Sequence, residues 1–161
     1  MLEVFGLPTH ILLLHAVVVL SPLAAVGGIL YAVVGRWRRA TEWTVAVLAV
    51  VSAGFAVVTA SAGERLEEAL PASPLIHEHA EHGDLLKVIA VIFAGLVILL
   101  VLATGPWSAR RLPQLDGVRA LSWLRILLQV LTVLAGLFLI YQTIVTGHSG
   151  AVATWSNWRK S

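Results

Sequence analysis

Four apolar runs, each close to the length that crosses a lipid bilayer, constrain the fold of this chain more than any other feature. They cover residues 11–34, 43–60, 85–103 and 126–145, and the only Asp, Glu, Lys or Arg inside them is Lys87. A helix rises 1.5 Å per residue, so about 20 residues cover the roughly 30 Å of hydrocarbon. Charged residues make up only 12% of the chain, against about 25% in soluble domains. The runs predict an all-α, polytopic membrane four-helix bundle.

A single transmembrane domain is expected over residues 1–161, with spans at about 8–35, 43–66, 80–104 and 120–147. The first run differs from a cleaved signal peptide, which begins with basic residues and is shorter. The first basic residue here is Arg36, so we expect this run to remain as a helix. Gly54, Gly95 and Gly136 lie near the middle of their spans, where small residues allow helices to approach closely.

Charge placement predicts the orientation of the bundle. Arginines fill the first and third connections, at Arg36, Arg38, Arg39, Arg110, Arg111, Arg119 and Arg125. Acids surround the second connection, at Glu64, Glu67, Glu68, Glu78, Glu81 and Asp84. Basic loops stay in the cytoplasm, so both termini are expected to be extracytoplasmic in a bacterial cytoplasmic (inner) membrane. Indole rings anchor at the headgroups of the basic side, at Trp37, Trp43, Trp107 and Trp123.

The expected partners follow from this topology. The net charge of +2 reflects loop arginines rather than a nucleic-acid surface, so no nucleic acid is expected as a partner. The lipid bilayer is the predicted environment. A homo-oligomer or a larger membrane complex stays open, because the sequence does not distinguish them from a monomer.

All six histidines are predicted to lie at the acidic, extracytoplasmic side: His10, His15, His77, His79, His82 and His148. Imidazole titrates near neutral pH and, when neutral, binds transition metals or haem iron. The chain has no cysteine, which excludes disulfides, thiolate metal sites and covalently attached haem. Any metal is therefore held by nitrogen and oxygen, and any haem is non-covalent.

Each span contributes a candidate ligand near the same rim: His15, Glu64, His79 and His148. Three imidazoles and a carboxylate suit Fe, Cu or Zn, and His10 is a further candidate for such a metal site. Two imidazoles from different helices equally suit a haem b between facing helices. His77 and His82, in an acidic segment, are expected to be solvated or salt-bridged. Lys87 is expected to reach the headgroups, or to be a counter-ion for Glu64 or a haem propionate.

These residues resemble a domain-of-unknown-function family of small bacterial membrane proteins with four spans. The family's first helix reads His-Pro-x-x-x-His-Phe-Pro, and here His10 and His15 keep the histidine spacing without the prolines. Ser61-Ala62-Gly63-Glu64 is similar to the family's Ala-Gly-x-x-acid, and residues 146–151 to its Thr-Gly-His-x-Gly-Gly. The resemblance covers nearly the whole chain. The positions of this chain that match the family pattern are His10, His15, Glu64, His79 and His148. The similarity of the family to small b-type cytochromes implies haem binding.

Three functions remain open from the sequence. The first is a haem b protein that passes electrons at the extracytoplasmic face, with His15 paired to His79 or His148 and Lys87 nearby. The second is a non-haem metal centre of three His and Glu64 for metal handling or oxidation. The third is a non-catalytic accessory membrane subunit. No catalytic residue is assigned, and whether the protein is an enzyme stays open.

Overall fold

The computed structural model describes residues 3–4 and 7–156, with side chains from Thr9 onward. The helices are α1 (Thr9–Val33), η1 (Gly35–Trp37), α2 (Arg38–Ala69), α3 (Pro74–Thr104), α4 (Pro106–Arg111), η2 (Pro113–Leu115), α5 (Asp116–Arg119) and α6 (Ser122–Trp155). Two short strands, β1 (Glu3–Val4) and β2 (Leu7–Pro8), pair antiparallel ahead of α1. The predicted all-α arrangement of four long helices is confirmed.

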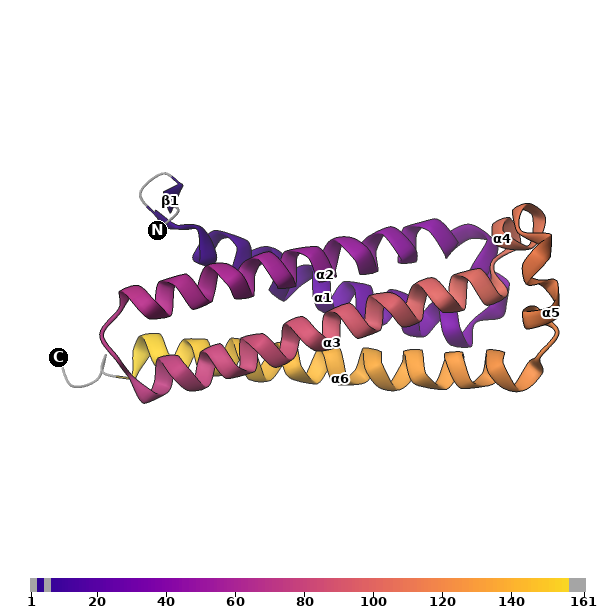
Figure 1. Ribbon diagram of the computed structural model, residues 1–161. Helices are drawn as coiled ribbons and strands as arrows, with labels where there is room; N and C mark the ends of the chain where they lie inside the picture. Colours follow the sequence, from indigo (N-terminus) through magenta and orange to yellow (C-terminus); the bar gives the residue numbers. More distant parts are fainter. Residues whose placement is uncertain (1–2, 5–6, 157–161) are drawn as a thin grey trace.

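The four long helices form an antiparallel bundle (Figure 1). α1 packs against α2 and α6, and α3 packs against the same two helices, so α1 and α3 lie on a diagonal. The start of α1, the α2–α3 connection and the end of α6 lie together at one end, here called the histidine end. The short helices η1, α4 and α5 lie at the opposite end, here called the arginine end. All four long helices are long and apolar enough to cross a membrane.

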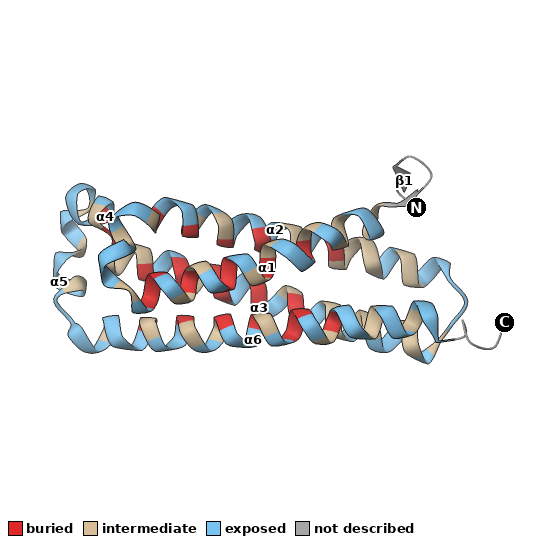
Figure 2. Cartoon of the chain, turned by 180° about the vertical axis from the view of Figure 1, so that it is seen from behind, coloured by how far each residue is buried: buried red, intermediate tan, exposed pale blue. Residues whose placement is uncertain are grey.

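Small residues are common inside the bundle beside a few large side chains such as Phe93 and Leu100, whereas most large apolar residues lie outside. Alanines are most numerous among the buried residues of α1 and α2, as at Ala24, Ala49 and Ala56. Valine, leucine and isoleucine cover the outward faces, which are mostly exposed in Figure 2. Lipid tails are as apolar as leucine, so packing in a bilayer depends on close backbone approach rather than on burying large side chains. The distribution is that of a protein surrounded by lipid.

Phe93 of α3 fills the middle of the bundle because two glycines leave room for it. A Cβ atom at Gly28 of α1 would lie 2.6 Å from Phe93 Cζ, and one at Gly136 of α6 would lie 3.3 Å from Phe93 Cε2. The predicted packing role is therefore confirmed for Gly136. It is wrong for Gly54 and Gly95, where a Cβ would meet nothing within 4 Å, because these two glycines point away from the neighbouring helices.

The helices continue beyond the expected membrane spans. α3 begins at Pro74 rather than at residue 80, with the proline in its first turn, where its missing N–H costs nothing. α6 runs on to Trp155 rather than ending at residue 147, straight through Gly147 and Gly150. This extension places the segment around His148 on a helix, and so fixes which of its side chains face inward.

The glycine contacts predict the effect of alanine at two positions. Gly28→Ala forces a methyl group against Phe93, whose side chain is only 1% exposed and has little room to retreat. We expect it to destabilise the bundle by roughly 1–3 kcal/mol relative to Gly54→Ala, which makes the same helix-propensity change in open space. Thermal unfolding in detergent measures the difference, and equal stability of the two variants would contradict the packing described.

Candidate functional site

A cavity of about 660 Å³ opens between all four long helices at the histidine end. His10 of α1 and His79 of α3 lie in its wall. Four glycines also line it: Gly63, Gly83, Gly147 and Gly150. The volume falls within the roughly 300–1,000 Å³ of typical ligand and cofactor pockets. Glycine lining widens the space between the helices, so this end of the bundle has room for a bound group.

His10 is held against α2 by a hydrogen bond and by a close contact. Its Nδ1 donates to the Thr59 carbonyl oxygen over 2.9 Å. A Cβ at Gly63 would lie 3.0 Å from the ring, so glycine is what lets the imidazole lie this close to the helix. Because a carbonyl oxygen can only accept, the Nδ1 atom carries the proton. The Thr59 hydroxyl is buried and has no hydrogen-bond partner among the described residues.

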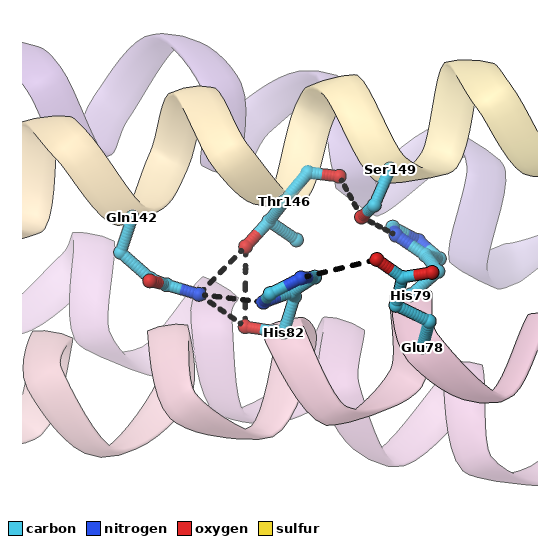
Figure 3. A network of polar contacts seen from close by, with 6 residues as sticks. All are labelled: Glu78, His79, His82, Gln142, Thr146 and Ser149. Atoms are coloured by element: carbon cyan, nitrogen blue, oxygen red, sulfur yellow. Dashed lines mark hydrogen bonds and ion pairs between the residues drawn. The ribbon is translucent and has the colours of Figure 1, made fainter. Parts of the chain in front are cut away.

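His79 is held against α6 in the same manner (Figure 3). Its Nδ1 lies 3.0 Å from Ser149 Oγ, and that hydroxyl donates to the Thr146 carbonyl oxygen over 3.0 Å. A hydroxyl has one proton to donate, so His79 Nδ1 is the donor to Ser149. A Cβ at Gly150 would lie 2.9 Å from the His79 ring. Each imidazole thus rests on a glycine of the neighbouring helix and donates from Nδ1.

The rings of His10 and His79 meet edge to face across the bundle. Their centroids are 6.2 Å apart and their planes are 80° from parallel. With Nδ1 protonated in both, the lone pair of each neutral ring lies on Nε2. Two half-buried imidazoles from different helices, both with Nε2 as the free acceptor, form a pair suited to metal ligation.

One turn further along α3 from His79, hydrogen bonds join α6 to the backbone of His82 (Figure 3). The His82 carbonyl oxygen accepts from Gln142 Nε2 and from Thr146 Oγ1, each over 3.1 Å. Both donors are almost fully buried. These bonds fix the height of α3 against α6, and they set where His79 meets Ser149 one turn further out.

His77 and His82 form the ion-pair contacts expected of an acidic segment. His77 Nδ1 lies 3.0 Å from Glu67 Oε1, and its Nε2 lies 3.6 Å from Glu81. His82 Nε2 lies 3.9 Å from Glu78. Neither histidine lines the cavity. The contact of His77 with Glu67 joins α3 to α2, and the other two contacts lie within the first turns of α3.

The predicted ligands divide into those that line the cavity and those that do not. His10, Glu64 and His79 line it. His15 is exposed and its Nδ1 bonds the Ile11 carbonyl of its own helix over 2.8 Å, while His148 is exposed on α6. Five residues turn a helix by about 140° beyond a full turn, so His10 and His15 cannot both face inward. Within the described residues, no three His, Asp or Glu side chains lie close enough together to hold one metal ion.

Lys87 joins α2 to α3 beside the cavity. Its Nζ donates to Asp84 Oδ1 over 2.7 Å and to Glu64 Oε1 over 3.2 Å. Of the roles expected for Lys87, the structure contains the contact with Glu64. An ammonium has three N–H donors, so one donor remains beyond these two carboxylates.

Sequence reasoning missed the groups that orient the two rings. Ser149 and the Thr59 carbonyl receive their Nδ1–H groups, and Gly63 and Gly150 lie beneath them. In the sequence, Ser149 is a small residue next to His148, and nothing in the pattern indicates that it contacts His79. A backbone carbonyl has no side-chain signature, so the Thr59 contact had no signal in the sequence.

Comparison with known protein families identifies the family to which the chain belongs. A family model described as a predicted membrane protein (DUF2231) matches residues 6–158. The chain therefore belongs to the DUF2231 family of predicted membrane proteins, and it is a multi-pass membrane protein. No curated protein and no solved structure is found to match it.

The Ser149 contact predicts a coupling between two side chains. His79→Ala and Ser149→Ala remove the same hydrogen bond, so their effects on unfolding free energy should be non-additive by about 0.5–1.5 kcal/mol. His148→Ala is the matched control, because His148 is exposed beside Ser149 and lies outside the cavity wall. A double-mutant cycle in mixed detergent micelles measures both. Equal coupling of His79 to Ser149 and to His148 would refute the assigned bond.

Proposed function

We propose that this member of the DUF2231 family is an integral membrane haem b protein that passes electrons at the extracytoplasmic face, in which His10 and His79 would hold the haem iron. The observation that carries the proposal is the pair of neighbouring imidazoles, from two different helices, in the wall of a four-helix cavity. His79 keeps the role expected from the sequence, and His10 takes the place expected for His15.

The separation of the rings fits two imidazoles that share one ion. Metal–imidazole bonds are about 2 Å long, and the ring centroid lies about 1 Å behind the nitrogen, so two opposed ligands have centroids about 6 Å apart. The observed separation is 6.2 Å. The two rings belong to α1 and α3, the helices on the diagonal of the bundle.

The surroundings of the rings also fit a ligand site. Metal-ligating histidines usually donate their second ring N–H to a carbonyl or another acceptor, which fixes the tautomer. His10 does this with the Thr59 carbonyl, and His79 does it through Ser149.

The residues of the chain would bind and shield the cofactor. A bound haem supplies one-electron redox chemistry. Ile11 and Leu14 of α1 and Ile76 of α3 give the cavity an apolar lining that would contact the apolar part of the haem ring. The remaining donor of Lys87 is available for a haem propionate, whereas Glu64 and Asp84 keep the ammonium in place. The electron would leave through the exposed histidine end.

The direction of the bundle in the membrane is part of the proposal. The arginine end holds the exposed residues Arg36, Arg39, Arg110, Arg111 and Arg125, so the positive-inside rule favours its location in the cytoplasm. The histidine end and both chain termini are then extracytoplasmic, in the inner membrane of a bacterium.

An absorption spectrum of the detergent-purified protein from haem-replete cells tests the proposal. We expect a Soret band and a reducible alpha band with stoichiometric haem. His10→Ala and His79→Ala should lose both bands because each removes a ligand, whereas His15→Ala and His148→Ala should keep them. Bands that survive the first two variants, or a wild-type spectrum without them, would exclude this site. Stoichiometric Fe, Cu or Zn without haem would favour the non-haem alternative instead.

Filling the cavity gives an independent test that leaves every polar group in place. Gly83→Leu should abolish haem binding, because Gly83 lines the cavity and a Cβ there meets nothing within 4 Å. Gly54→Leu is the matched control, since Gly54 has equally open space but lies outside the cavity wall. Haem content per folded chain measures the contrast. Wild-type haem content in Gly83→Leu would place the cofactor elsewhere.

A further inference from the structure

The arginines of the arginine end are of two kinds. Arg38 and Arg119 are structural: the guanidinium of Arg38 donates to the carbonyls of Tyr31 and Ala32, and that of Arg119 to the carbonyls of Leu102 and Leu112. The others are exposed, at Arg36, Arg39, Arg110, Arg111 and Arg125, and none forms an ion pair within the part of the chain that the structure describes.

The acids at this end do not neutralise those exposed arginines. Asp116 pairs with Arg119 over 2.7 Å. Glu42 is only 6% exposed, and its carboxylate accepts the backbone N–H of Trp107 over 3.2 Å. That bond holds the start of α4 against α2. The exposed guanidinium groups therefore lack an anionic partner from the described chain.

Two of these arginines flank an exposed pair of indoles. Trp43 of α2 and Trp107 of α4 meet edge to face, with ring centroids 4.9 Å apart, and are 55% and 37% exposed. Arg39 precedes Trp43 by four residues on α2, and Arg111 follows Trp107 by four residues on α4. Residues four apart share a helix face. Arg39 and Arg111 therefore belong to the faces that carry the two indoles.

We propose that Arg39, Trp43, Trp107 and Arg111 form a docking site for one anionic phospholipid of the adjacent leaflet. Exposed tryptophans lie at the headgroup level of a membrane, and Trp43 stands where the apolar run of α2 begins. The guanidinium groups bind the phosphate and the anionic headgroup, and the indole faces pack against the glycerol and the first acyl carbons. Lipid is favoured over free phosphate because half of the site is apolar and borders the hydrocarbon.

Fluorescence quenching by brominated lipid tests the site on the full chain. The protein is reconstituted in phosphatidylcholine vesicles that contain either brominated phosphatidylglycerol or brominated phosphatidylcholine at the same fraction. The chain has six tryptophans, so the emission of Trp43 and Trp107 is measured with the other four replaced by phenylalanine, in W37F/W123F/W155F/W158F. We expect phosphatidylglycerol to quench this emission with roughly three- to tenfold higher apparent affinity. The double variant R39Q/R111Q should bring that ratio close to one. Raised salt should weaken the preference, and excess inorganic phosphate should leave it unchanged.

The matched control is R36Q/R125Q, which removes the same charge from the same end but leaves the flanks of the indole pair intact. It should keep most of the preference. Equal quenching by the two lipids in the parent protein overturns the proposal. An equal loss in both double variants also overturns it, since it would indicate general surface charge. Displacement by inorganic phosphate would indicate an anion site rather than a lipid site. Circular dichroism checks that the variants are folded.

Discussion

The absence of water in the hydrocarbon is the constraint on which the rest of this structure depends. Every backbone polar group there must be satisfied inside the chain, so each apolar run forms one long helix. Because lipid tails are as apolar as leucine, close helix packing depends strongly on alanine and glycine, as where Phe93 lies between Gly28 and Gly136. Polar side chains inside the bundle meet each other, as do Ser21 and Ser52 at 3.1 Å.

The helices are held together by different contacts at the two ends of the bundle. At the histidine end, glycines bring an imidazole of one helix against the backbone of the next, and the space between the helices becomes a cavity. At the arginine end, Glu42 and the Trp43–Trp107 pair seat α4 on α2 and close the bundle. The histidine end thus has space for a bound group, whereas the arginine end carries exposed positive charge.

Much of the fold followed from the sequence, whereas the site followed only in part. The length of the apolar runs was enough to predict four packed helices. Three of the predicted ligands, His10, Glu64 and His79, line one cavity. The choice between His10 and His15 depends on helix phase, which five-residue spacing leaves open until one face is known to be buried. His148 follows the expected fourth span, at about 120–147, but α6 continues through it to Trp155 and leaves its side chain exposed.

We propose that His10 and His79 would together hold one haem iron. Electron paramagnetic resonance of the oxidised, purified protein tests this most directly, because the signal reports both the number and the relative orientation of axial imidazoles. Ring planes that are 80° from parallel predict a low-spin ferric signal of the strongly anisotropic kind given by near-perpendicular imidazoles. A high-spin signal, a low-spin signal typical of parallel rings, or no haem signal at all would contradict the account.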